Sequence, residues 1–172
     1  MTLSYGDLQA HLGPQRFNSP HMDQDDLRLL PNIFEAYFID YHIDDEFYIG
    51  SGFVRTAKGW ENNDDAKKFV DIGEAFGGTG ALSWLAWGKY QQGSIDANVW
   101  YYYIKDVQQI FFMDITYQDR INDIFFYELG GQFDLGRSIG SQSIGLVDAN
   151  TLGAYATIGA YGVSFTTAYN KN

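Results

Sequence analysis

Apolar and polar residues alternate with a period of two along several stretches of this chain, each about ten residues long. In the clearest stretch, 95–106, one face carries Ile95, Ala97, Val99, Tyr101 and Tyr103, and the other carries Asp96, Asn98, Trp100 and Tyr102. Because successive side chains of a strand point to opposite faces, this pattern predicts a strand with one apolar face. Similar patterns occupy 108–118, 125–133, 152–158 and 163–169, and weaker ones occupy 2–12, 32–41, 46–57 and 80–90.

Nine strands of this length would place about half of the 172 residues in β-structure, well above the roughly 20–25% of an average soluble domain. The excess predicts an all-β, antiparallel fold, and 13 Tyr and 13 Phe residues agree with it. A net charge of -11 makes nucleic acid an improbable partner, and the absence of cysteine excludes a disulfide scaffold. No run of about 18 apolar residues occurs, which excludes a transmembrane helix, but a transmembrane barrel needs no such run.

The connections between the strands come close to alternating in length. Long connections span 13–31, 58–79 and 134–149, whereas short ones lie near 42–45, 91–94, 119–122 and 159–162. Long loops on one rim and short turns on the other are typical of outer-membrane barrels. The pattern leaves one alternative open, a soluble β-sandwich that binds carbohydrate through exposed Trp and Tyr side chains.

The segment 12–41 joins two of the expected strands and carries a distinctive set of residues, namely Gly13, Gln15, Asn18, Ser19, Pro20, Asp23, Asp25, Asp26, Arg28, Leu29, Leu30, Pro31, Asn32, Phe34, Glu35 and Ala36. With these residues it resembles the segment of the OprD-like outer-membrane porins that runs from one strand through the inward-folding third loop into the next strand. A second match is Lys58-Gly59-Trp60-Glu61-Asn62. One departure is Pro14, which stands where the family usually has Arg, so the resemblance carries over no basic role at this position.

The resemblance implies a transmembrane β-barrel segment in the outer membrane of a Gram-negative bacterium, with about nine strands of an expected eighteen. Residues 1–172 would then form a single partial barrel domain, an interior fragment of a porin. The implied function is passive, size- and charge-selective diffusion of small hydrophilic solutes. The implied partners are outer-membrane lipid, lipopolysaccharide and those solutes, while monomer and homotrimer both stay open for the intact protein.

Residues 13–31 are expected to form the loop that folds into the pore and narrows it. Its charged residues would set a field across the constriction, namely Arg16, Asp23, Asp25, Asp26 and Arg28. The alternative for this segment is a solvated surface loop. The strand patterns also place Asp96, Asn98, Asp114 and Glu128 on the water-filled side, where their role is either specific binding or plain solvation. Arg55 and Lys89 are expected to join them in a lumen-lining ladder like that of the family, because a Lys or Arg that faces lipid near mid-membrane would cost about 2–4 kcal/mol.

The sequence offers little support for catalysis. The three histidines, His11, His21 and His42, lack the spacing of metal ligands. Gly77-Gly78-Thr79-Gly80 lacks the Lys-Ser/Thr pair of a phosphate-binding loop. We therefore expect neither an enzyme nor a cofactor.

Overall fold

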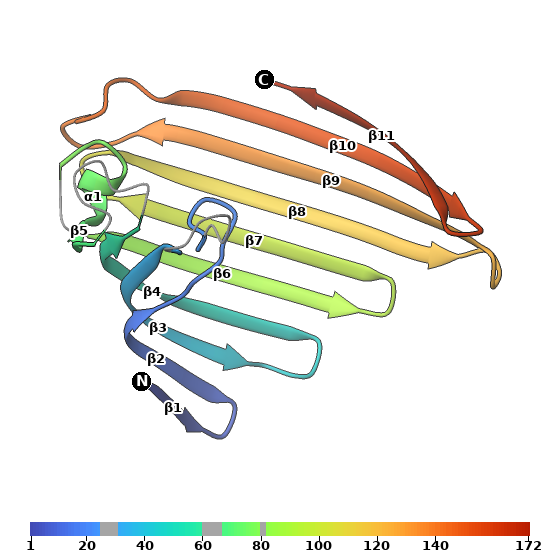
Figure 1. The fold of residues 1–172 in the computed structure, drawn as a ribbon, viewed down its shortest axis with the longest axis horizontal. Coiled ribbons are helices and arrows are strands. Elements are labelled where there is room, and N and C mark those ends of the chain that lie inside the picture. The colour runs from blue at the N-terminus through green and yellow to red at the C-terminus, as the bar shows by residue number, and fades with distance from the viewer. Residues whose placement is uncertain (25–30, 60–66, 80–81) are drawn as a thin grey trace.

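The strands form one antiparallel sheet in the computed structural model, which describes residues 1–24, 31–59, 67–79 and 82–172 (Figure 1). The strands are β1 (Thr2–Tyr5), β2 (Leu8–Gln15), β3 (Ile33–His42), β4 (Phe47–Lys58), β5 (Val70–Asp71), β6 (Ser83–Gln92), β7 (Ile95–Ile104), β8 (Gln108–Arg120), β9 (Phe125–Ser138), β10 (Asp148–Ala160) and β11 (Val163–Lys171). The only helix in these ranges is α1 (Ile72–Ala75). Within them, no helix has the length and apolar character needed to cross a membrane. A single continuous sheet confirms the all-β antiparallel prediction and differs from the two packed sheets of a sandwich.

Eleven strands appear in the described ranges, whereas the alternation predicted nine. The stretch 2–12, expected as one strand, is a hairpin of β1 and β2, because Gly6 adopts a left-handed φ of 57° that turns the chain. The other addition is β5, whose two residues pair with the end of β4 inside the expected connection 58–79. All other strands lie where the alternation placed them, with shifts at their ends.

The two rims of the sheet differ as the connection lengths predicted. One rim carries the connections 16–32, 59–82 and 139–147, and the opposite rim carries only tight hairpins at 6–7, 43–46, 93–94, 121–124 and 161–162 (Figure 1). The exception is 105–107, a short link on the rim with long connections. We call these the long-loop rim and the turn rim.

The two faces of the sheet differ in burial. Phe38, Trp87, Trp100 and Tyr102 lie buried on one face, together with Leu85. We call it the loop face, because the connection between β2 and β3 packs onto it. The opposite, outward face leaves many apolar side chains exposed, among them Ile39, Trp84, Val99, Met113, Ile115, Leu129, Ile158 and Phe165. Exposed apolar side chains on this scale indicate contact with something other than water.

Large aromatic rings on the loop face lie flat over glycines of neighbouring strands. Such cross-strand pairs include Gly50 with Trp87, Gly130 with Tyr155 and Gly159 with Phe126. A Cβ at any of these glycines would overlap the ring of its partner. Each glycine is therefore required by a close approach of side chain to backbone.

Candidate functional site

Residues 16–24, here called the inner loop, pack across the loop face in front of β6 and β7 (Figure 1). Phe17 anchors the start of this loop: its ring centroid lies 4.6 Å from that of Phe38 and 6.0 Å from that of Trp100. Met22 anchors the other end and is 3% exposed. The inner loop is therefore packed against the sheet rather than solvated.

Hydrogen bonds within the connection fix its shape. The Ser19 amide donates to the Met22 carbonyl at 2.7 Å, and the Gln24 amide donates to Asn18 Oδ1 at 3.0 Å. The Asn32 amide, just before β3, donates to the Gln24 carbonyl at 2.7 Å. These bonds satisfy backbone groups that packing removes from water.

A side-chain contact ties the inner loop to a distant strand. His21 Nε2 lies 2.6 Å from Asp134 Oδ2 on β9. Tyr102 and Phe112 meet the imidazole edge-on, with centroids 5.4 and 5.8 Å away. The loop is thus held at β9 as well as at the aromatic cluster around Phe17.

A cavity of about 560 Å³ separates the inner loop from the sheet. Its polar lining includes Asn18, Asp23 and Gln24 from the loop and Lys89, Asn98 and Asp114 from the sheet. Asn98 Nδ2 donates to Asp114 Oδ2 at 3.0 Å and to Asp96 Oδ1 at 2.9 Å, so one amide bridges two carboxylates. Lys89 Nζ lies 5.9 Å from the Trp100 ring centroid.

A second polar group lies on the loop face nearer the turn rim. Tyr155 donates its hydroxyl proton to Glu128 Oε1 at 2.6 Å, and its oxygen lies 3.2 Å from Thr116 Oγ1. Asp96, Thr116, Glu128 and Tyr155 contribute to a cavity of about 360 Å³. Asp96 also belongs to the group around Asn98, so the two groups are continuous along the sheet.

Five of the six residues expected to line a lumen lie on the loop face, namely Lys89, Asp96, Asn98, Asp114 and Glu128. Arg55 does not join them: its Nη1 lies 3.8 Å from Glu35 Oε1 on the outward face, so its placement on the lumen side is corrected. Arg55 lies two residues after the outward-facing Phe53, so strand alternation turns it outward, and the pairing at the β-bulge between β3 and β4 skips it.

The residues expected to form the constriction are only partly described. Asp23 lines the cavity beneath the inner loop, whereas Arg16 is exposed just beyond β2 and is absent from that lining. Asp25, Asp26 and Arg28 lie outside the described residues.

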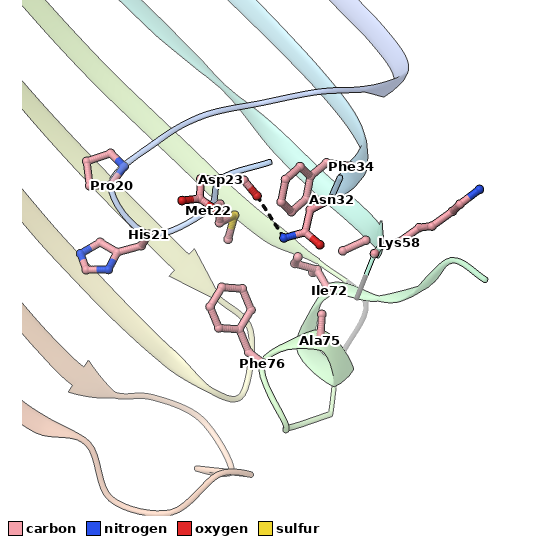
Figure 2. A pocket seen from close by; sticks show the side chains of 12 residues that line it. Pro20, His21, Met22, Asp23, Asn32, Phe34, Lys58, Ile72, Ala75 and Phe76 are labelled. Carbon is pink, nitrogen blue, oxygen red and sulfur yellow. Dashed lines mark hydrogen bonds between the residues drawn. The ribbon is translucent and has the colours of Figure 1, made fainter. Parts of the chain in front are cut away.

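A larger cavity, about 670 Å³, lies on the other side of the inner loop, between it, α1 and the ends of β3 and β4. Figure 2 shows Met22, Asn32, Phe34 and Phe76 gathered around it, with Asn32 Nδ2 donating to the Asp23 carbonyl at 3.3 Å. In the same view the Lys58 side chain extends away from the cavity.

Sequence reasoning missed the residues that hold the inner loop in place. His21 was considered only as a metal ligand, and within the described residues no group of His, Asp and Glu side chains is arranged to hold a metal. The available signal was the presence of Phe17 and Met22 in an otherwise polar connection, because bulky apolar side chains in a loop indicate packing.

The site offers charge and hydrogen bonding along an open wall. The carboxylates of this face are Asp40, Asp96, Asp114, Glu128 and Asp134, against the cationic side chains of Lys89 and Arg120. Such a wall, with a loop packed over it and an apolar outward face behind it, has the architecture of a transmembrane β-barrel of the outer-membrane type.

A family model for the outer membrane porins of the OprD family matches residues 3–172. The chain therefore belongs to the OprD family of outer membrane porins. The family places it in the outer membrane of a Gram-negative bacterium, and its members are channels rather than enzymes.

Solved porin structures share the fold at low sequence identity. Pseudomonas aeruginosa OccK2 (OpdF) in complex with glucuronate is 19% identical, with a TM-score of 0.85, over 99% of this chain and 46% of that one. P. aeruginosa OpdK with vanillate is 16% identical, with a TM-score of 0.85 over 99% and 45%. Acinetobacter baumannii OccAB3 is 14% identical, with a TM-score of 0.81 over 99% and 44%.

The chain thus spans less than half the length of these structures. Among curated proteins, none matches it.

Proposed function

We propose that this chain forms part of the wall of a water-filled pore through which small hydrophilic solutes diffuse passively, selected by size and charge. The observation that carries the proposal is the packing of the inner loop onto the loop face of the sheet, with a cavity of about 560 Å³ between the two. A segment anchored in this position reduces the open cross-section and brings Asp23 opposite Lys89 and Asp114. On this proposal, the connection 16–32 holds the constriction loop of a partial barrel domain; the expected bounds of 13–31 included the last residues of β2.

The charge of the wall supports a preference for solutes with a cationic group. Asp96 and Asp114 lie on either side of Asn98, and Lys89 is the nearby cation. OccK2 and OpdK were solved with glucuronate and vanillate, both carboxylates. In this chain, Lys89 offers an ammonium for a carboxylate, while Asp114 and Asp96 favour the positive end of a zwitterion.

Ion selectivity tests the proposal directly. The protein in its natural full length is inserted into planar bilayers, and the reversal potential is measured under a salt gradient. Asp114→Asn removes a wall charge and is expected to shift the reversal potential toward anion permeation. Asp119→Asn is the matched control, because Asp119 lies on the same strand with its side chain on the outward face.

Absence of discrete single-channel conductance in the wild-type protein would overturn the pore itself. Equal shifts of the reversal potential in Asp114→Asn and Asp119→Asn would overturn the role of the wall.

We further propose that the outward face contacts lipid and lipopolysaccharide, because it carries the exposed apolar side chains.

A further inference from the structure

We propose that Arg55 and Lys58, on the outward face at the end of β4, bind a phosphate group of outer-leaflet lipopolysaccharide. The proposal rests on the proposed function in one respect, the contact of the outward face with lipid. It adds a specific site and the chemistry of its ligand.

The β-bulge brings Lys58 onto the outward face, where strand alternation already places Arg55. Phe53 faces outward, so unbroken alternation would also turn Arg55 outward but Lys58 toward the loop face. Because pairing skips Arg55, Val54 opposes Ala36 and Thr56 opposes Glu35. Thr56 therefore faces outward, as does Lys58, which agrees with the direction of its side chain in Figure 2.

The two cations are close enough to share one anion. Three residues of strand span about 10 Å, and both side chains are long enough to converge over that distance. Arg55 has a side chain that is 62% exposed, and it donates no hydrogen bond to any residue within the described ranges. The Lys58 ammonium lies 5.6 Å from the ring centroid of Phe69. A guanidinium can donate two parallel hydrogen bonds to phosphate oxygens, and a neighbouring ammonium adds a second positive charge for the same anion.

The carboxylates next to the pair are already engaged. Glu35 accepts hydrogen bonds from Thr56 Oγ1 at 2.9 Å and from the Tyr37 hydroxyl at 3.2 Å. The distance of 3.8 Å between Glu35 Oε1 and Arg55 Nη1 is too long for a hydrogen bond. Asp71 pairs with Thr56 in the sheet and is a second carboxylate nearby. The residues before Phe69 are the exposed Lys67 and Lys68, which add positive charge to this side.

The position of the pair along the strand matches the depth of lipid headgroups. Lys58 is the last residue of β4 and lies at the long-loop rim, the extracellular side in barrels of this kind. Aromatic side chains line the outward face on the side of the cations away from the long-loop rim. The ring centroid of Phe53 lies 5.0 Å from that of Tyr37, which stacks on it, and 5.5 Å from that of Trp84. Such aromatic girdles mark the boundary between hydrocarbon and headgroups. The cations therefore stand where the phosphates of an outer-leaflet lipid are found.

The test measures lipopolysaccharide bound by the purified full-length protein in detergent, by native mass spectrometry and titration. The variant Arg55→Gln/Lys58→Gln is expected to lose at least tenfold in affinity. Lys171→Gln is the control, because Lys171 faces outward at the same rim but at the far edge of the sheet. We expect the control to stay within twofold of wild type, and the single variants Arg55→Gln and Lys58→Gln to show intermediate losses.

Two further arms identify the ligand. Enzymatically dephosphorylated lipopolysaccharide is expected to bind wild type no better than it binds the double variant, and excess inorganic phosphate should compete only weakly. Equal binding by wild type and double variant, or by phosphorylated and dephosphorylated lipid, would overturn the proposal. Equally tight binding of phosphatidylglycerol would show a general anionic-lipid surface instead.

Channel conductance separates this proposal from the proposed function. The double variant should conduct as wild type does, because both side chains lie outside the pore. Normal conductance with unchanged lipopolysaccharide binding would therefore refute the lipid site alone. If the double variant does not fold, the two single variants and Arg55→Lys, which keeps the charge, decide the question.

Discussion

The contact between His21 and Asp134 predicts that a single pair of side chains controls how long the inner loop stays in place. His21 Nε2 and Asp134 Oδ2 are 2.6 Å apart in a close polar contact, and the imidazole nitrogen makes no hydrogen bond within the described ranges. A contact of this kind between partly exposed side chains contributes about 1 kcal/mol. Loss of the pair should therefore lower the ratio of docked to undocked loop by a factor of about 5.

The assay is single-channel recording of the full-length protein, in which loop excursions appear as transitions between conductance levels. His21→Ala and Asp134→Ala should each increase the fraction of time at the altered level, and the double variant should add little to either. A double-mutant cycle on the ratio of dwell times gives the coupling free energy. The exchanged pair, His21→Asp with Asp134→His, should recover part of the wild-type behaviour.

Additive effects in that cycle would refute the reasoning, and so would a coupling below about 0.5 kcal/mol, the usual scatter between independent sites. His21→Ala loses the packing of the imidazole against Tyr102 and Phe112, and the double variant loses it equally, whereas Asp134→Ala keeps it, so this loss cancels in the cycle. The coupling term therefore reports the polar contact itself.

The remaining predictions concern the same face of the sheet. Phe17→Ala removes the half-buried anchor on Phe38 and should weaken loop docking by about 2 kcal/mol, below the roughly 3–5 kcal/mol of a fully buried Phe; faster protease cleavage in the loop checks this, and Phe17→Leu should stay close to wild type. Gly130→Ala should push the ring of Tyr155 away from the wall and lower conductance, and adding Tyr155→Ala should restore it; unchanged conductance in Gly130→Ala would contradict the close approach. Tyr155→Phe leaves Glu128 without its hydroxyl donor and should cost about 1 kcal/mol of stability, measured by chemical denaturation.

Local patterns were sufficient to predict most of the sheet. The stretch 95–104 is a strand because its two faces differ in polarity, and a period of two is visible in sequence whenever one face is buried. The same alternation placed Asp96, Asn98, Asp114 and Glu128 on the loop face, whereas Lys89 was expected there from the resemblance and from the cost of a lipid-facing charge. The hairpin turn at Gly6 was missed because its flanking residues carry no clear alternation.

The rest depended on features that local alternation does not contain. A β-bulge changes the face of every residue after it, so the outward position of Lys58 is set by pairing with β3 and not by its own strand. The contact of His21 with Asp134 joins segments that are far apart in the chain, and the residue pattern within either segment gives no signal for it. Arg55 was misplaced because the cost of a lipid-facing charge was applied as if it stood at mid-membrane, whereas it lies near the rim.

The flat packing of rings over Gly50, Gly130 and Gly159 has a consequence for electrical resistance. A ring that stood upright on the wall would occupy space through which ions and water move. Lying against a neighbouring backbone, Trp87, Phe126 and Tyr155 add rigidity to the wall while taking little from the conducting area. On the proposed function, the width of the passage is then set by the inner loop packed on this wall, and the wall side chains contribute charge without narrowing it.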